Sequence, residues 1–404
     1  MQKRYDSGTP ATTILIISLQ GIGNTLMIYP LITTLGRRGA RIDAVVSDNG
    51  SHDIMAAHPF IRNVYPWREK RSAMMNIWNI SCKLRKTVYD AAYSASPSWT
   101  RESIVAMACR ANRKEGFAGD QRYYLDKILI GLGGITRRSR ESDHDFINNR
   151  NLFGLGAQEV DLNKNNLLFL ERKAQCRAGA LCSREIPEGG GAFLIALHPG
   201  SKAKERRWST KKFSELANRL AKKHDFVRFV IIGGADEVEL MESLRKDIKG
   251  GATVARGLSL IEAALLLRNC GIFIGNDSAP MHFAALQYIP NISIWGLSNY
   301  RRTSPVGNRS VIVRKRLPCS PCYDAALSTH MNCRTGLECI HTISVDEVFS
   351  VADSYVDSIR KAGSSVSNTV LETGSLRAER EILETGALVL HLIPGLQSEG
   401  APQP

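Results

Sequence analysis

The stretch TILIISLQGIGN, residues 13–24, decides the fold of the first half of the chain. Its first seven residues are mostly apolar and β-branched, which favours a buried strand over residues 13–19, and a glycine-rich loop follows over 20–24. An apolar stretch typical of a helix then covers 25–35, and RIDAVVS at 41–47 predicts a second strand. Because parallel strands need a crossover helix between them, this order predicts a parallel sheet covered by helices.

The second half of the chain repeats this alternation of strands and helices. Phe213, Leu216, Ala217 and Leu220 recur at helical spacing and would share one face of a helix. We expect strands at 193–197, 227–232, 271–275 and 292–295, and helices at 210–224, 236–248, 259–267, 281–287 and 344–361. Strands that alternate with helices in this way predict a second doubly wound α/β sheet.

The domain boundaries follow from the length of the chain and from a polar stretch in its middle. A chain of 404 residues suggests about two to three domains. Residues 171–191, ERKAQCRAGALCSREIPEGGG, end in three glycines and predict a connection between domains. We expect an N-terminal Rossmann-like domain over 1–175, a linker over 176–191, a C-terminal Rossmann-like domain over 192–362, and a mobile tail over 363–404 with a short helix around 375–391.

The composition is that of a water-soluble globular protein, with 43% hydrophobic and 23% charged residues. No apolar run reaches the roughly 18–20 residues that span a bilayer, and the first residues lack the apolar core of a signal peptide. We therefore expect a cytoplasmic protein. The 53 basic and 39 acidic residues give a net charge of +14, which favours phosphates, nucleic acid or an acidic lipid surface as partner. Solubility alone is the simpler explanation of this charge.

One candidate anion site follows the first strand of the second half. His198, Pro199, Gly200 and Ser201 come directly after this strand, and a basic segment with Arg206 follows them. A hydroxyl group, backbone N–H groups and a guanidinium group together suit a phosphate. The alternative is a turn followed by solvated charges.

A second candidate site is the segment GNDSAPMH at 275–282, which begins a helix immediately after a strand. Asp277 or Ser278 can cap this helix, and Pro280 suits its first turn. The N-terminus of a helix attracts anions. The alternative is a simple cap at Asp277 and a histidine, His282, that faces the core.

Together these segments resemble glycosyltransferase family 9, the ADP-heptose:lipopolysaccharide heptosyltransferases and their relatives. The resemblance runs in order over about residues 13–345. It includes ILIISLQGIGNTLMIYPLITTL, ALHPGS, RRWSTKKFSELANRL, VIIGGADEVEL, GLSLIEAALLLRNCGIFIGNDSAPMHFAALQ and ISIWGLS. The resemblance implies a GT-B fold, in which two Rossmann-like domains face a cleft. It also implies inverting transfer of heptose or a related sugar from a nucleotide diphosphate to a cell-surface glycan such as lipopolysaccharide core, with no cofactor for the chemistry.

The resemblance also implies which residues bind the nucleotide sugar. Ser201 and Lys202 match the family's phosphate-contacting loop. Arg206 matches a basic residue at the diphosphate; lysine is common there, so that arginine keeps the charge and changes the geometry. Asp277 matches an acid that binds hydroxyl groups of the sugar.

The remaining matches belong to the nucleoside and to the start of a helix. Glu239 matches an acid that binds the ribose hydroxyl groups, and Leu258 matches an apolar residue beside the adenine. Ser278, Ala279 and His282 match residues around the diphosphate. Ala279 often aligns with glycine, but backbone N–H contacts survive that change.

Asn24 departs from the family pattern. The family's proposed general base is an aspartate in the first glycine-rich loop, whereas this chain has Gly23 and Asn24 there. An amide cannot accept a proton at neutral pH. Either another group is the base, or the protein differs in substrate or activity. A nucleotide-sugar-binding protein with lost or altered catalysis is therefore an alternative.

An oxidoreductase that binds a dinucleotide is a further alternative. Gly21 and Gly23 follow a strand and Asp48 follows the next one, as in a dinucleotide-binding fingerprint, but Leu26 stands where the third glycine belongs. No nucleic-acid-binding motif accompanies the positive charge, so we expect no nucleic-acid partner.

Four cysteines form a cluster in the sequence. Cys319, Cys322, Cys333 and Cys339 have the spacing C-x2-C-x10-C-x5-C. Four thiolates can hold a structural zinc or iron ion, although the pattern lacks a second C-x2-C pair. The alternative is a loop with four reduced thiols.

The partners that the resemblance implies are anionic. The donor would be a nucleotide diphosphate sugar similar to ADP-heptose, and the acceptor an acidic or phosphorylated glycan or glycolipid. The net charge of +14 agrees with such ligands. Residues 69–86 are basic and amphipathic, and contact with the inner face of a membrane would bring the protein to a glycolipid.

Overall fold

A computed structural model describes residues 12–95, 99–117, 134–138, 144–162, 164, 166–167, 193–322, 333–362, 378–385 and 387–392. The chain divides between Cys176 and Arg177 into two compact units, although residues 260–262 and 286–288 group with the first. The linker expected over 176–191 lies outside the described residues. No helix in the described part is long and apolar enough to cross a bilayer.

The first unit contains a six-stranded parallel sheet in the order β3-β2-β1-β4-β5-β6. This is the strand order of a dinucleotide-binding α/β fold. Its strands are β1 (Thr13–Ser18), β2 (Arg41–Ser47), β3 (Ile61–Trp67), β4 (Val88–Ser94), β5 (Arg110–Phe117) and β6 (Ile135–Arg138). Its helices are α1 (Ile22–Arg37), α2 (Ser51–Ala56), α3 (Ala73–Leu84), α4 (Trp99–Ala108) and α6 (Asp145–Leu152).

Helix α1 begins earlier than the sequence predicts. Gly21 is its N-cap, and the helix starts at Ile22 rather than near residue 25. The glycine-rich loop is therefore shorter than expected, because Gly23 and Asn24 already have helical geometry. Asn24 lies in the first turn of the helix, directly after the carboxyl end of β1.

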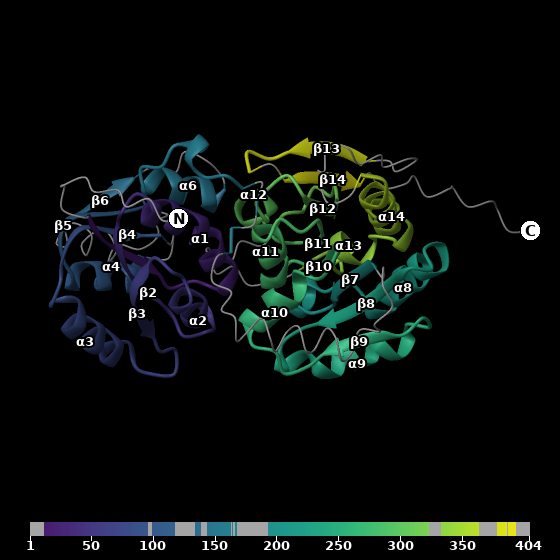
Figure 1. Cartoon of the computed structure of the whole chain (residues 1–404), viewed down its shortest axis with the longest axis horizontal. Coiled ribbons are helices and arrows are strands. Elements are labelled where there is room, and N and C mark those ends of the chain that lie inside the picture. The colour runs from purple at the N-terminus through teal and green to yellow at the C-terminus, as the bar shows by residue number, and fades with distance from the viewer. Residues whose placement is uncertain are drawn as a thin grey trace, which may run out of the picture. The chain divides into compact units, whose positions relative to one another are not determined.

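The second unit repeats the same strand order. β9-β8-β7-β10-β11-β12 are all parallel, and β14 and β13 extend this sheet beyond β12 (Figure 1). The strands are β7 (Phe193–His198), β8 (Val227–Ile232), β9 (Ala252–Ala255), β10 (Ile272–Asn276), β11 (Asn291–Trp295) and β12 (Ser310–Lys315). The helices are α8 (Thr210–Lys223), α9 (Val238–Asp247), α10 (Leu260–Leu267), α11 (Ala279–Leu286), α12 (Tyr300–Thr303), α13 (Glu338–His341) and α14 (Val345–Ala362).

The core of the second unit forms as the apolar spacing predicts. Phe213, Leu216, Ala217 and Leu220 share the buried face of α8 and pack with the strands and with α14. Burial of each of the larger of these side chains, Phe213, Leu216 and Leu220, stabilises the fold by about 1.5–3 kcal/mol. The central strands are mostly apolar on both faces because helices cover both faces of the sheet.

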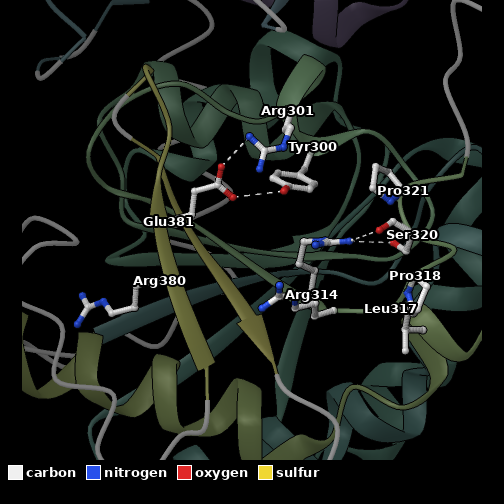
Figure 2. A pocket seen from close by; sticks show the side chains of 10 residues that line it. Tyr300, Arg301, Arg314, Leu317, Pro318, Ser320, Pro321, Arg380 and Glu381 are labelled. Atoms are coloured by element: carbon white, nitrogen blue, oxygen red, sulfur yellow. Dashed lines mark hydrogen bonds and ion pairs between the residues drawn. The ribbon is translucent and has the colours of Figure 1, made fainter.

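Part of the expected tail has a different structure. β13 (Ala378–Ile382) and β14 (Leu388–Leu392) form an antiparallel hairpin, where the sequence predicts a short helix in a mobile tail. β14 lies parallel to β12, and Leu388, Val389 and Leu390 are buried. Figure 2 shows Arg380 and Glu381, which β13 carries. The helix expectation was wrong because LVLHL is a short apolar run that forms a buried strand paired with β12.

Candidate functional site

Polar residues gather at the carboxyl ends of β7 and β10 in the second unit. These two strands are neighbours in the sheet, and β8 lies on the other side of β7. The strand order reverses between β7 and β10, and ligands of doubly wound sheets bind at this point. The segments at 198–201 and 276–278 follow the two strands, so both candidate anion sites from the sequence meet here.

Asn276 joins the two segments. Its side-chain Nδ2 donates to the carbonyl oxygens of Pro199 at 2.8 Å and Gly200 at 3.3 Å, while Oδ1 accepts from the backbone N–H of Trp208 at 3.0 Å. Asn276 is fully buried, and buried polar groups are costly unless they are paired. This side chain therefore fixes the backbone of both segments.

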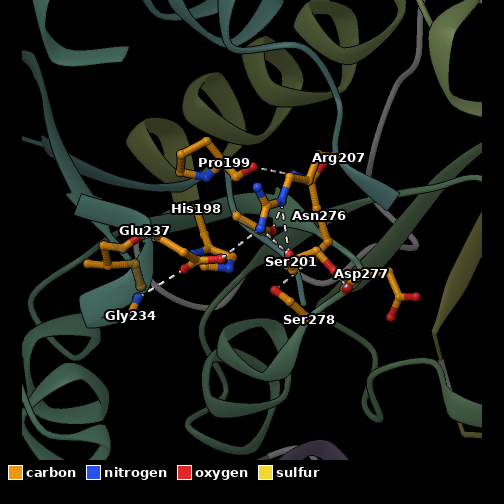
Figure 3. Close-up of polar contacts among 11 residues, drawn as sticks. His198, Pro199, Ser201, Arg207, Gly234, Glu237, Asn276, Asp277 and Ser278 are labelled. Atoms are coloured by element: carbon orange, nitrogen blue, oxygen red, sulfur yellow. Dashed lines mark hydrogen bonds and ion pairs between the residues drawn. The ribbon is translucent and has the colours of Figure 1, made fainter. Parts of the chain in front are cut away.

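Ser201 and Arg207 strengthen the same contact (Figure 3). The Ser201 hydroxyl donates to the carbonyl oxygen of Asp277 at 3.0 Å. The guanidinium group of Arg207 donates from Nε and Nη2 to the carbonyl oxygen of Ser201, at 2.9 and 2.6 Å. Ser278 donates to the carbonyl oxygen of Asn276 at 3.2 Å. The segment after β7 is thus held in a single conformation next to the start of α11.

Arg206 and Asp277 form an ion pair at this site. Arg206 Nη1 lies 3.3 Å from Asp277 Oδ2, and the Asp277 side chain is 9% exposed. Burial raises the pKa of Asp277, whereas Arg206 and a hydrogen bond with Ser298 act in the opposite direction. The pair places a guanidinium group and a carboxylate beside the N-terminus of α11, where a phosphate and a hydroxyl-bearing group can bind together.

Glu237 and His198 lie behind this ion pair, at the carboxyl ends of β8 and β7. Glu237 is buried, accepts from the backbone N–H of Gly234 at 2.9 Å, and lies 4.0 Å from Arg207. His198 donates from Nδ1 to the carbonyl oxygen of Ile232 at 2.9 Å, and burial lowers its pKa. A Cβ atom at Gly200 would lie 1.9 Å from a carboxylate oxygen of Glu237. The Glu237 carboxylate therefore needs glycine at position 200.

The residues that the resemblance implies are distributed unevenly around this cluster. Ser201, Arg206, Asp277 and Ser278 belong to the cluster, and Lys202 is exposed directly beside Ser201. The others lie on neighbouring elements: Ala279 and the buried His282 on α11, the exposed Glu239 on α9, and the partly buried Leu258 after β9.

Sequence reasoning missed three residues of the cluster as contributors: Asn276, Arg207 and Glu237. Each lies in a segment that carries the family resemblance, within two residues of a residue to which the resemblance assigns a role. Glu237 precedes Glu239 by two residues in GGADEVEL, and the short 3-10 turn Ala235–Glu237 places it at the end of the strand. The sequence signal for a role of Glu237 is the preceding pair Gly233 and Gly234, because a carboxylate near glycines can approach the backbone of a neighbouring segment.

The four cysteines of the sequence cluster lie after β12. The Sγ atoms of Cys319 and Cys333 lie 4.0 and 3.6 Å from Oγ1 of Thr335. Burial, together with the charges of the other three thiols, raises the pKa of Cys339 to about 11. Among the described residues, which exclude 323–332, no group of three or more His, Cys, Asp or Glu side chains is arranged to hold a metal ion.

Comparisons with known proteins agree with this geometry. The family model described as glycosyltransferase family 9 (heptosyltransferase) matches residues 77–331. A lipopolysaccharide heptosyltransferase 1 from Pseudomonas aeruginosa is 24% identical over 336 residues, which cover 76% of this chain and 85% of that protein. A lipooligosaccharide heptosyltransferase 2 from Campylobacter jejuni is 29% identical over 138 residues. That match covers 33% of this chain and 43% of the relative, so the chain spans less than half the length of this relative.

Solved structures share the fold. A glycosyl transferase family 9 protein from Veillonella parvula has a TM-score of 0.71 at 19% identity, with 86% of this chain and 98% of that one covered. The E. coli heptosyltransferase WaaC with ADP has a TM-score of 0.63 at 16% identity, with 85% and 100% covered. The predicted GT-B fold of two Rossmann-like sheets is confirmed. Since its model matches more than half of the residues, the chain belongs to glycosyltransferase family 9.

Proposed function

We propose that the protein transfers a sugar, heptose or a related one, from a nucleotide diphosphate donor to a saccharide acceptor with inversion. The observation that carries this proposal is the cluster at the carboxyl ends of β7 and β10. It combines an ion pair between the partly buried Arg206 and the buried Asp277 with a hydrogen-bonded backbone segment at the start of α11. Such a site offers donors to a diphosphate and an acceptor to hydroxyl groups.

Each residue of the cluster has a role in this proposal. Arg206, Lys202 and the N-terminus of α11, with Ser278, Ala279 and His282, face the diphosphate, and Asp277 accepts from hydroxyl groups of the sugar. Arg207 and Asn276 hold the backbone on which these groups stand. Leu258 provides an apolar contact for the base. No metal takes part in the chemistry that we propose.

The names of the relatives suggest the ligands. They are described as lipopolysaccharide and lipooligosaccharide heptosyltransferases, and one similar structure holds ADP. We infer an ADP-heptose-like donor and an acidic or phosphorylated glycan acceptor such as lipopolysaccharide core. The net charge of +14 supports an anionic acceptor.

The test is a product assay. The protein is incubated with ADP-heptose or another nucleotide sugar and with a lipopolysaccharide-core acceptor, and mass spectrometry follows the acceptor mass. We expect one sugar to be added, with the inverted anomeric configuration in the NMR spectrum. The Asn24→Asp variant is assayed in parallel, because a carboxylate there raises turnover only if a missing base limits the reaction.

A second candidate function is binding of a nucleotide sugar without transfer. The observation that favours it is Asn24, which lies in the first turn of α1, directly after β1, with an amide where the family has a carboxylate. Calorimetric binding of the nucleotide sugar without any product would favour this candidate. If neither binding nor product is detected, both candidate functions are excluded.

Glu237 rather than Glu239 is the acid that we assign to the ribose. Glu237 is buried at the end of β8 beside Arg207, whereas Glu239 is exposed on α9. We expect Glu237→Gln to weaken nucleotide-sugar binding about 5- to 150-fold, since a buried hydrogen-bonding group is worth about 1–3 kcal/mol. Glu239→Gln is the matched control and should change affinity by less than about twofold. If calorimetry shows a larger loss of affinity in Glu239→Gln than in Glu237→Gln, the ribose contact belongs to Glu239.

Helix α3 offers a surface for contact with a membrane. Met74, Met75 and Trp78 are 80%, 54% and 72% exposed. Glu69 is the only acidic residue over 68–86. Exposed basic residues flank the three apolar ones: Arg68, Lys70, Arg71, Lys83, Arg85 and Lys86. Exposed aromatic and sulfur side chains beside basic residues suit an interface with acidic lipids. We infer that this surface brings the enzyme to a glycolipid at the inner face of a membrane.

Substitutions on α3 test this contact. We expect Trp78→Ser to weaken binding to vesicles that contain phosphatidylglycerol by about tenfold, because burial of a large apolar side chain contributes about 1.5–3 kcal/mol. Val88→Ser, which changes another exposed apolar residue of the first unit, is the control. Sedimentation of the protein with vesicles measures the effect. Equal binding by both variants would contradict the role of α3.

The cysteines form a proposed structural site for zinc or iron. Neighbouring thiols help to raise the pKa of Cys322 and of Cys339, and thiolates are ligands of both metals. We expect metal analysis of protein purified without added metal to give about one equivalent, and Cys319→Ser to lose both metal and stability. Cys82→Ser is the control. Ser320→Ala is not suitable, because the Ser320 hydroxyl accepts a hydrogen bond from Arg314. Metal-free protein of full stability would favour plain thiols.

A further inference from the structure

Asp48 is an exposed carboxylate at the edge of the first sheet where ligands of such sheets bind. It directly follows β2, the strand next to β1. Its backbone N–H donates to the carbonyl oxygen of Trp67, the last residue of β3, at 3.0 Å. In doubly wound sheets an acidic residue in this place accepts hydrogen bonds from hydroxyl groups of the ligand. Asp48 is therefore placed to meet a hydroxyl group.

One oxygen of the Asp48 carboxylate is held in place and the other is free. Oδ1 accepts from the backbone N–H of Glu69 at 3.1 Å. Within the described residues, Oδ2 has no hydrogen-bond or ion-pair partner. An ionised carboxylate accepts about four hydrogen bonds, so one bond to Oδ1 fixes the direction of the group and leaves Oδ2 able to accept a proton.

The turn that carries Asp48 is tied to the start of α1 at two points. The side-chain Nδ2 of Asn49 donates to the carbonyl oxygen of Gln20 at 3.3 Å, just before the helix. Within the helix, Thr25 Oγ1 donates to Ser51 Oγ at 3.0 Å, and this hydroxyl donates to Asn49 Oδ1 at 2.8 Å. The Asp48 carboxylate and the first turn of α1 therefore belong to one hydrogen-bonded junction.

Other carboxylates at or near the carboxyl ends of these strands are buried or unsupported. Glu115 of β5 and Glu102 of α4 are 3% and 0% exposed, so that neither is accessible to a glycan. Glu69 follows β3 and is exposed, but no residue in the described part of the chain holds its side chain. Asp48 combines exposure with a fixed direction, and a proton acceptor in catalysis must be positioned in this way.

Transfer of a sugar to a hydroxyl group requires that the hydroxyl group lose its proton. Asn24 does not accept it, because an amide is not a base at neutral pH. We propose that Asp48 is the general base and that its Oδ2 takes the proton from the attacking hydroxyl group. The hydroxyl oxygen forms a bond to the anomeric carbon of the donor, the bond from this carbon to the diphosphate oxygen breaks, and the electron pair leaves with the nucleoside diphosphate. The proposal rests on the transferase function proposed above.

Asp48→Asn tests this role, because the amide keeps the shape of the side chain and its oxygen can still accept from the Glu69 N–H. We expect kcat to fall about 10²–10⁴-fold, which is the usual contribution of a general base, with the same calorimetric affinity for the nucleotide sugar. Asp48→Glu should keep part of the turnover. Asp53→Asn is the matched control: it removes a carboxylate of α2 that is 73% exposed and should leave kcat unchanged.

Chemical rescue distinguishes a proton acceptor from a structural residue. Formate added to Asp48→Ala should restore part of the lost turnover, because a small carboxylate can take the place of the missing side chain and accept the proton. Sodium chloride at the same ionic strength should have no such effect. Asn24→Asp added to Asp48→Asn should also restore part of the turnover, since it returns a carboxylate to the same junction.

Three results would overturn the proposal. The first is an equal kcat in the wild-type protein and Asp48→Asn, and the second is a loss in Asp48→Ala that formate does not restore. The third is a large loss in Glu69→Gln without one in Asp48→Asn, which would assign the proton to Glu69. Failure of the transferase function has a different signature: the wild-type protein then forms no product, and the role of Asp48 falls with it.

Discussion

Replacement of Asn276 by alanine is expected to lower the free energy of unfolding of the second unit by about 2–6 kcal/mol. The side chain pairs the N–H of Trp208 and the carbonyl oxygens of Pro199 and Gly200, and it is fully buried. Alanine leaves at least two of these backbone groups without a partner away from water, at about 1–3 kcal/mol each. Urea denaturation followed by circular dichroism measures the change.

Ser278→Ala is the matched control for Asn276→Ala. Its hydroxyl makes one hydrogen bond, to the carbonyl oxygen of Asn276, from a partly buried position. We expect a loss of about 1 kcal/mol or less. The Asn276 variant should also bind nucleotide sugar more weakly, since both segments of the site lose their common support. If the two variants were equally stable, Asn276 would not be the link between the segments.

Arg206→Ala is expected to weaken ADP binding about 5- to 150-fold while adenosine binding hardly changes. Only ADP offers phosphate oxygens to the guanidinium group, and a lost charged hydrogen bond costs about 1–3 kcal/mol. Asp277→Ala should weaken binding of the nucleotide sugar over a similar range, because an acceptor for hydroxyl groups is lost and Arg206 loses its buried partner at 3.3 Å. Calorimetry with each ligand measures the affinities.

A double-mutant cycle sharpens this prediction. Because Arg206 and Asp277 are in direct contact, the loss of binding free energy in the double variant should differ from the sum of the losses in the single variants by about 0.5–3 kcal/mol. Lys204→Ala removes an exposed charge two residues before Arg206 and is the control for bulk electrostatics. Equal losses for ADP and adenosine, or an equal loss in Lys204→Ala, would assign the effect to the overall positive charge.

Much of the fold is predictable from local patterns. The strands predicted at 41–47 and 227–232 have the same bounds as β2 and β8, and the one predicted at 193–197 agrees with β7 within one residue. These segments are mostly apolar, and a predicted helix follows those at 193–197 and 227–232. The hairpin of β13 and β14 was missed because β14 depends on pairing with β12, more than 70 residues earlier in the sequence. Local propensity does not report such a distant partner.

The site was less accessible to prediction. The resemblance indicates which loops hold it, and the structure brings four of the implied residues together: Ser201, Arg206, Asp277 and Ser278. The role of Asn276 depends on partners 68 and 77 residues away in the sequence. Glu237 depends on the close approach of Gly200 from another strand. Such contacts arise only when the sheet is assembled, so single motifs do not reveal them.

The hairpin at 378–392 also protects the protein against self-association. Among the described strands, β13 is at the edge of the eight-stranded sheet, and its sequence, AEREI, places charged side chains along that edge. Charges on an edge strand oppose the addition of a strand from another molecule. β14, by contrast, is LVLHL and is largely buried. A protein shortened before residue 378 would expose the apolar flank of β12, and its shelf life in solution would then be limited by aggregation rather than by unfolding.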